Sequence, residues 1–193
     1  MHDSRAKDRR VQKTRRLLLH ALGSLLPEKR YDAIVVQDIL DRANVGRSTF
    51  YTHFRDKDDL LQSAVRDVLR ATAPEAPPSG RRSERVLRFS RPMFEHIAQH
   101  LRAGKGGMGP RSRALVHERL RQVLAERVAE EVASVVRGPT SARVPTELVV
   151  KLVTSTFVAV LDWWVERGGR MAAAEVDEVF RALVLPSLAA AID

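Results

Sequence analysis

Apolar residues recur every three or four positions along almost the whole chain, which is the spacing of one face of an α-helix. No segment shows the alternation of apolar and polar residues that is typical of a half-buried β-strand. The pattern therefore predicts an all-α protein. The helices that it predicts cover residues 11–26, 36–43, 47–54, 57–69, 84–101, 112–137, 147–167 and 173–191.

Prolines and glycines separate these helices. Pro27 is expected to end the first helix, because proline cannot continue the hydrogen-bond pattern. Gly168 and Gly169 are expected to end the helix that starts near residue 147. Residues 73–83 contain three prolines, a glycine and two serines, which predicts a linker. Pro186 is expected to kink or stop the last helix.

Two of the predicted helices, 36–43 and 47–54, are short and lie on either side of a tight turn. Two short helices that cross at a turn form a helix-turn-helix. Such a turn needs a residue that tolerates a left-handed backbone, and Asn44 is well suited to it. Val45 is expected to fill the space between the two helices. The sequence therefore predicts a helix-turn-helix at residues 36–54.

The second short helix has one apolar face and one polar face. Phe50 and Phe54 are one turn apart, so both can point into a core. The remaining side chains are expected to face outward, at the part of a recognition helix that meets base edges. Those suited to bases are Arg47, Ser48, Thr49 and Thr52, and those suited to phosphate oxygens are Tyr51 and His53.

Residues 31–61 resemble the DNA-binding region of the tetracycline-repressor (TetR) family of bacterial transcription regulators. The residues that carry the resemblance are Tyr31, Ile39, Ala43, Val45, the run Arg47-Ser48-Thr49-Phe50-Tyr51, His53, Phe54, Lys57, Leu60 and Leu61. The resemblance implies base-edge contacts from Arg47, Ser48 and Thr49. It implies phosphate contacts from Tyr51, His53 and Lys57, and a backbone or base contact from Gln37. A core position for Tyr51 is the alternative.

The charge of the chain fits a polyanionic partner. The net charge is +9, and residues 1–16 hold seven basic and two acidic residues. A disordered basic arm that adds affinity for DNA is expected there. The chain has no cysteine and no apolar leader at its start. The apolar run 148–165 contains Lys151 and Asp162, so it is a poor membrane span. A cytoplasmic location with no membrane partner is expected.

The resemblance also implies two domains: a three-helix DNA-binding domain at residues 1–60 and a helical effector-binding and dimerisation domain at residues 61–193. The helix at 147–167 is apolar on nearly all sides, so it must be covered on two of them. With the helix at 173–191, it is expected to form a four-helix interface in a homodimer. The alternative is a single helix buried in the centre of one chain.

Methionine and aromatic residues suggest a pocket for a small-molecule effector, although such residues at helical spacing more often belong to a plain core. No charged residue in the sequence is placed where it must contact a ligand, so a lipophilic effector is expected. The candidate pocket residues are Met93, Phe94, Ile97, Met108, Phe157, Leu161, Trp163 and Trp164.

Two motifs suggest other chemistry. His96 and His100 have the i, i+4 spacing of helical metal ligands, but Ile97 stands where a zinc protease has its glutamate. Residues 104–107, Gly-Lys-Gly-Gly, lack the Ser or Thr of a phosphate-binding loop. The sequence thus predicts a regulator that is a homodimeric repressor responding to an effector, with no cofactor and no catalytic residue. The alternatives are an effector-independent or partner-controlled DNA-binding regulator and, more remotely, a metal-dependent hydrolase.

Overall fold

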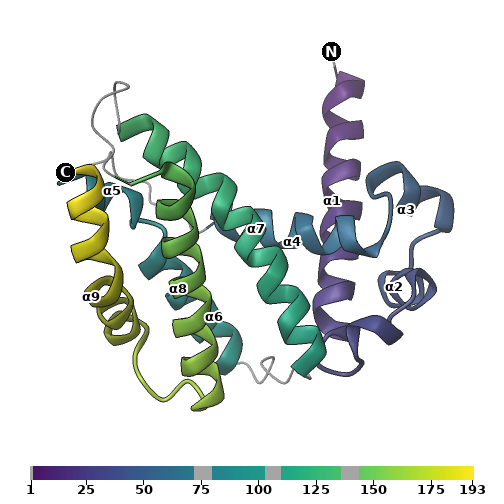
Figure 1. Ribbon diagram of the computed structural model, residues 1–193. Helices are drawn as coiled ribbons and strands as arrows, with labels where there is room; N and C mark the ends of the chain where they lie inside the picture. The colour runs from purple at the N-terminus through teal and green to yellow at the C-terminus, as the bar shows by residue number, and fades with distance from the viewer. Residues whose placement is uncertain (1, 72–79, 103–109, 136–143) are drawn as a thin grey trace. The chain divides into compact units, whose positions relative to one another are not determined.

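The computed structural model describes residues 2–71, 80–102, 110–135 and 144–193, and every element of regular structure in these ranges is a helix (Figure 1). This confirms the predicted all-α fold. The elements are α1 (His2–Leu25), the 3₁₀ helix η1 (Tyr31–Ala33), α2 (Val36–Ala43), α3 (Arg47–His53), α4 (Lys57–Ala71), α5 (Arg82–Val86), α6 (Ser90–Arg102), α7 (Pro110–Val135), α8 (Thr146–Glu166) and α9 (Ala173–Ile192).

The prediction of a disordered arm is wrong for residues 2–16, because α1 begins at His2 and is continuous to Leu25. The segment contains no glycine or proline, and its arginines, lysines and alanine are good helix formers. The basic residues of this segment are therefore carried on a helix.

The single helix predicted at 84–101 is also wrong, since the chain breaks between α5 and α6. The carbonyl of Leu87 accepts hydrogen bonds from the Ser90 N–H at 3.1 Å and from the Arg181 guanidinium at 3.1 Å. These bonds take the place of the bond that this carbonyl would form in a continuous helix. Pro186, by contrast, lies inside α9 without stopping it.

Two predicted connections lie wholly or partly outside the described residues. The glycine-rich segment 104–107 is one of them. The linker predicted at 73–83 is the other, and α5 already begins within it at Arg82.

The described residues fall into two compact units, each with its own core. The first contains the chain up to Val65 together with the start of α7 as far as Val116, and the second contains the rest. α4 and α7 therefore contribute residues to both units. The sequence did not predict that the start of α7 belongs to the first unit.

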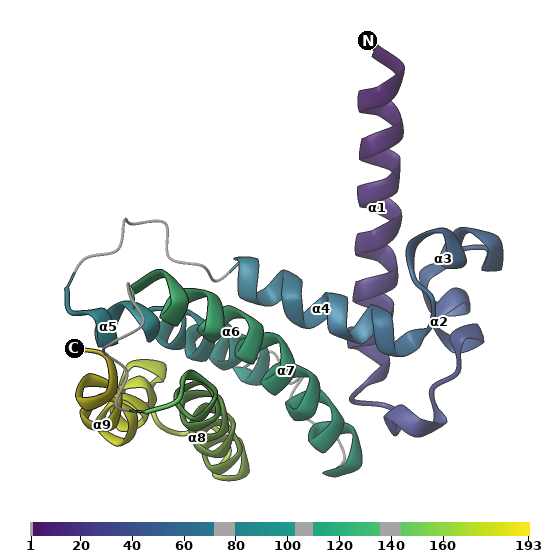
Figure 2. The same ribbon diagram turned by 45° about the horizontal axis from the view of Figure 1, so that its top comes forward.

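The core of the first unit is built from α1, η1, the helix-turn-helix and the start of α4, with α2 and α3 on one side of α1 (Figures 1 and 2). Its central side chains are fully buried, and Leu115 and Val116 of α7 pack against them. Those central side chains are Leu18, Leu22, Ile34, Ile39, Phe50 and Leu60.

Aromatic rings form the core of the second unit, where α9 packs against α5, α6 and α8 (Figures 1 and 2). Phe94 of α6 lies 4.7 Å from Phe157 of α8, measured between ring centroids. Phe157 in turn lies 5.4 Å from Phe180 of α9, edge to face. Rings at these separations add to the stability gained from burial alone.

Within the described chain, α8 is the one helix that is long and apolar enough to cross a membrane. Only 44% of its most apolar window is buried within the protein. Phe157 and Trp164 on its inner side pack against rings of the second unit, which is ordinary for a core helix. Leu148 and Leu152 on its outer side are 56% and 39% exposed, so this part of the helix has an apolar face that the chain itself does not cover.

Candidate functional site

The turn between α2 and α3 has the geometry that the sequence predicts. Asn44 adopts φ 51° and ψ 52°, which is the left-handed region, and it ends α2. It is the one residue other than glycine with positive φ in the described chain. The N–H of Val45 then bonds the carbonyl of Leu40 at 3.1 Å, and Gly46 begins α3 without a side-chain cap. This turn fixes how α3 crosses α2.

α3 buries its phenylalanines and exposes its polar side chains. Phe50 is fully buried, and Phe54 at the end of the helix is nearly so. Tyr51 is 52% exposed, which excludes the alternative of a core tyrosine. Its ring packs edge to face against Phe50, at 5.3 Å between centroids. The predicted contact residues Arg47, Ser48 and Thr52 are exposed, and Thr49 and His53 are half-buried.

A chain of hydrogen bonds links the exposed side of α2 to the start of α3. The Arg47 guanidinium donates to Oε1 of Gln37 at 2.9 Å. The amide nitrogen of Gln37 donates to Oδ1 of Asp41 at 2.7 Å. Because one end of the Gln37 amide is an acceptor and the other a donor, the two bonds fix its orientation. Asp41 therefore fixes the orientation of the Gln37 amide, and the Gln37 amide in turn orients the Arg47 guanidinium.

Lys57 is engaged with the backbone in front of α2. Its ammonium donates to the carbonyls of Tyr31 at 2.9 Å and Ile34 at 2.7 Å, and lies 4.6 Å from the centroid of the Tyr31 ring. The Lys57 ammonium thus stabilises η1 through these hydrogen bonds. If it also contacts a phosphate, its three N–H groups must be divided between the phosphate and these carbonyls. The Tyr31 hydroxyl also bonds the Asp58 carboxylate.

Two ion pairs hold α2 against the preceding segment. The Asp38 carboxylate accepts from Lys29 at 2.7 Å and from the Val35 N–H at 2.8 Å, and these bonds lower its pKa below the ordinary value. Arg42 donates to both oxygens of Glu28, at 3.1 and 2.7 Å. This bidentate pair lowers the pKa of Glu28 and raises that of Arg42.

Most of the predicted effector-pocket residues lie in the packed core of the second unit. Met93, Phe94, Phe157 and Leu161 are buried, and Ile97 is half-buried. Met108 lies outside the described residues.

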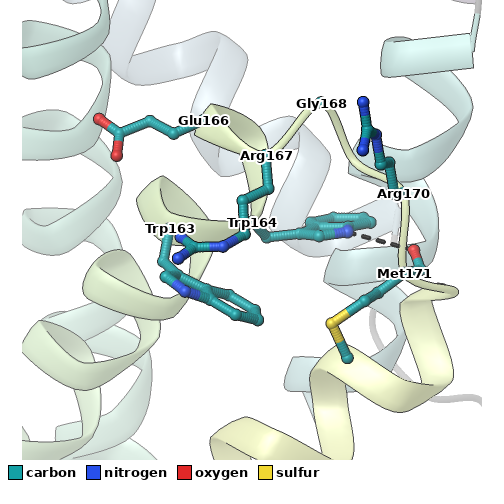
Figure 3. Close-up of a pocket in the computed structure, with 7 residues that line it drawn as sticks. All are labelled: Trp163, Trp164, Glu166, Arg167, Gly168, Arg170 and Met171. Atoms are coloured by element: carbon teal, nitrogen blue, oxygen red, sulfur yellow. Dashed lines mark hydrogen bonds between the residues drawn. The ribbon is translucent and has the colours of Figure 1, made fainter.

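A cavity of about 580 Å³ opens beside two of the predicted pocket residues, at the turn from α8 to α9 (Figure 3). We call it the α8–α9 cavity. It is lined by Trp163, Trp164, Glu166, Arg167, Gly168, Arg170 and Met171. The two tryptophans were predicted, but the two arginines were not. Their relation to the cavity depends on a turn whose path the sequence does not specify.

The described residues contain no group of three or more histidine, aspartate or glutamate side chains placed to hold a metal ion. His96 is half-buried on α6, and the side chain of His100 lies outside the part that the structure describes. The alternative of a metal-dependent hydrolase built on these histidines therefore gains no support from the described residues.

Known proteins resemble both the helix-turn-helix and the whole chain. Residues 18–64 match the family model described as bacterial regulatory proteins, tetR family. The chain is 42% identical over 59 residues to YxbF, an uncharacterized HTH-type transcriptional regulator of Bacillus subtilis (strain 168). This match covers 30% of the chain but 16% of YxbF, so it spans about a sixth of that relative.

Solved structures extend the likeness to almost the whole chain. A TetR transcriptional regulator from Streptococcus agalactiae 2603V is 26% identical, with a TM-score of 0.56, and the match covers 94% of this chain and 99% of that one. The transcriptional regulator FadR from Bacillus subtilis, in complex with stearoyl-CoA, has a TM-score of 0.60 over 88% of this chain and 96% of its own. Its 14% identity makes this a likeness of fold alone.

Proposed function

Because the chain belongs to the TetR family of bacterial regulatory proteins, we propose that it is a transcriptional repressor that binds a palindromic operator as a homodimer and releases it when a small-molecule effector binds. The observation that carries the DNA-binding part is the exposed polar face of α3 opposite the buried Phe50. A helix held by its apolar side and polar on its outer side suits the major groove.

The residues of this face have chemistry for separate tasks. Arg47 carries a planar guanidinium, which can bind guanine through two hydrogen bonds. The hydroxyl of Ser48 suits a base edge or a phosphate oxygen, and Thr52 already donates its own proton to the Ser48 carbonyl at 3.0 Å. Tyr51, exposed and anchored on Phe50, suits a phosphate. We therefore assign Arg47 to sequence recognition and Tyr51 to positioning on the duplex.

Exposed leucines on α8 and α9 support the homodimer. The two helices lie side by side (Figures 1 and 2), and Leu148, Leu152 and Leu183 are 56%, 39% and 58% exposed. Large apolar side chains left exposed on helices that pack together are typical of an interaction surface. In a two-fold symmetric dimer formed through this surface, each subunit contributes one recognition helix, so the dimer reads twice as many bases as one subunit does.

Effector binding is supported by the α8–α9 cavity and by the fold. Its volume of about 580 Å³ lies within the range of roughly 300–1,000 Å³ typical of small-molecule sites. FadR, which shares the fold, has been solved with stearoyl-CoA. The closed packing of Phe94, Phe157 and Phe180 favours the second candidate, a regulator controlled without a ligand. For either candidate we propose a cytoplasmic location.

Selection of bound duplexes from a random DNA pool tests the proposal. We expect enrichment of an inverted repeat whose half-sites are separated by one helical turn of DNA or a multiple of it. One turn corresponds to about 34–36 Å between the two recognition helices. Enrichment of a single unrepeated site would contradict the homodimer but keep DNA recognition. Recovery of the starting pool without any enrichment would contradict the proposed function.

A further inference from the structure

The helix α1 carries charge of one sign along most of its length. Residues 9–25 contain five arginines and lysines and no aspartate or glutamate. Pairs of opposite charge three or four residues apart therefore cannot form within this segment. The N-terminal end of α1 extends beyond α2 and α3 in both views (Figures 1 and 2). The positive charge is thus carried on a continuous helix and is not balanced by its own sequence.

Three of these basic residues and one histidine lie along one face of the helix. Arg9, Lys13, Arg16 and His20 are separated by four, three and four residues, which is the spacing of side chains that share a helix face. All four side chains are exposed. From first to last they span about 16 Å, at a rise of about 1.5 Å per residue. We call these four residues the α1 stripe.

The α1 stripe faces away from the core of the first unit. Leu18, which is fully buried, stands two residues from both Arg16 and His20, and two residues correspond to about 200° around a helix. On another side of α1, the Arg15 guanidinium lies 5.7 Å from the centroid of the Phe54 ring. Because these contacts hold α1 against the core in one orientation, the α1 stripe points into solvent in a fixed direction.

Two cations of the α1 stripe have no counter-charge in the protein. Within the part of the chain that the structure describes, neither Lys13 nor Arg16 forms an ion pair. The exposed cations beside α2, Lys29 and Arg42, are each paired with a carboxylate. The first unit therefore pairs cations that hold its helices together and leaves these two cations available to an external anion.

A row of cations on one helix face suits a row of phosphates. Each strand of a DNA duplex carries one phosphate per about 3.4 Å of its axis, so the α1 stripe is long enough to face several of them. The guanidinium of arginine matches the geometry of a phosphate group. A lipid surface fits less well, because a helix that binds one needs an apolar face. The exposed apolar residues of this segment, Val11 and Leu17, lie about 120° apart around the helix.

We propose that the α1 stripe is a second DNA-binding surface, which binds phosphates, reads no bases and is separate from α3. Each of the two helices turns its apolar face toward the same core, so their polar faces point in different directions. That the phosphates belong to DNA rests on the proposed function. That the α1 stripe binds a duplex does not require an operator, because the experiment below uses DNA of mixed sequence.

The salt dependence of binding to a duplex of mixed sequence, measured with the full chain by fluorescence anisotropy of labelled DNA, tests the proposal. The slope of log affinity against log salt becomes less steep by about 0.9 for each phosphate contact that is lost. Replacing both Lys13 and Arg16 by alanine should therefore reduce the steepness by about 2. Alanine has the highest helix propensity, so α1 should persist, and circular dichroism checks this. The same pair replaced by glutamine should lose as much.

Single variants separate the α1 stripe from the net charge of the chain. Arg16→Ala should reduce the steepness by about 1, and Arg16→Lys should reduce it less because it keeps the charge. Arg91→Ala is the matched control, since it also removes one exposed arginine, but one that lies on α6 and is paired with Glu95. It should leave the slope almost unchanged. None of these variants should change the sequence that is enriched from a random DNA pool.

Four results would overturn the proposal. They are an unchanged slope in both double variants, an equal loss in Arg16→Ala and Arg91→Ala, a change in the enriched sequence, and Arg16-dependent binding to vesicles of phosphatidylglycerol and phosphatidylcholine without any effect on duplex binding. Enrichment of an operator alongside any of these results would leave the proposed function intact. A loss of slope specific to the α1 stripe without any enrichment would contradict the proposed function and keep the second surface.

Discussion

Replacing Asp41 by alanine should weaken the discrimination between bases without reducing the general affinity for DNA. Asp41 accepts from the Gln37 amide at 2.7 Å, and that amide accepts from Arg47 at 2.9 Å. Without Asp41 the amide is free to turn over and present its NH₂ group to the guanidinium, which has no acceptor. Arg47 would then lose the bond that orients it toward the DNA.

The size of the effect follows from what Arg47 contributes. A bidentate arginine–guanine contact discriminates against the wrong base by about 1–3 kcal/mol. The chain of hydrogen bonds is exposed, so we expect its loss to remove about 1 kcal/mol of this discrimination, which is roughly fivefold in the ratio of dissociation constants. The lost charge acts in the opposite direction. Asp41 lies in the last turn of α2, where a negative charge opposes the helix dipole, and it also repels phosphates.

The assay compares Kd for the selected operator with Kd for operators changed at one base pair. Asp41→Asn keeps an acceptor oxygen but removes the charge, so it should retain the base preference that Asp41→Ala loses. Glu28→Ala is the control, because it removes a carboxylate of the same unit that bonds Arg42 instead. If both Asp41 variants keep the same preference as the unchanged protein, the hydrogen-bond chain has no role in recognition.

Three further predictions concern stability, assembly and the N-terminal helix. The buried Asp177 carboxylate accepts hydrogen bonds from the Ser90 hydroxyl and, at 3.0 Å, from the Arg181 guanidinium. Asp177→Ala should therefore lower the free energy of unfolding by about 3 kcal/mol, measured in a denaturant titration. A loss no larger than that caused by a substitution at an exposed site would contradict this role. Leu183→Glu should convert dimers to monomers, as measured by light scattering. Ala182→Glu, nearby on the same helix, should dissociate a smaller fraction of the dimers. A Leu183→Glu protein that stays dimeric would place the interface elsewhere. Removing residues 1–13 should make operator affinity depend less steeply on salt concentration and leave the preferred operator sequence unchanged. The reason is that the exposed basic residues of this helix have phosphates as their expected partners. A change in the preferred operator sequence would mean that the helix reads a groove.

One prediction concerns pH. The pKa of Asp38 is lowered chiefly by its bond with Lys29 and then by the Val35 N–H. A carboxyl whose pKa is lower in the folded state stabilises the protein above its unfolded pKa and loses that effect as the pH falls through the folded pKa. The stability difference between the unchanged protein and Asp38→Ala should therefore be present at neutral pH and shrink below about pH 4. A difference that stays constant down to acid pH would contradict this assignment.

The helix-turn-helix was predictable because its signals are local. Asn44 between two short amphipathic patterns specifies the turn, and Phe50 and Phe54 specify the inner face of α3 by their spacing alone. The same holds for the existence of α8, whose long apolar pattern predicts a helix there.

Features that depend on distant partners were not predictable. At the break after Leu87, its carbonyl accepts a bond from Arg181, which is 94 residues away in the sequence. The acceptors of Lys57 lie 23 and 26 residues before it, on a segment whose path is set by the core. In the sequence, Arg167 and Arg170 cannot be distinguished from ordinary surface residues. Only the path of the glycine turn shows that both line the same cavity. The N-terminal helix differs from the expectation for another reason, since a high density of charge favours disorder but these residues are good helix formers with no glycine or proline among them.

The claim that the exposed face of α3 reads DNA is tested most directly by Arg47→Ala and Tyr51→Phe on the selected operator and its single-base variants. The account predicts that Arg47→Ala loses about 1–3 kcal/mol of discrimination at one base pair of each half-site. Tyr51→Phe should weaken all duplexes alike and keep the preferred sequence. The account is contradicted if Arg47→Ala retains the full discrimination at every position, because another surface would then read the operator.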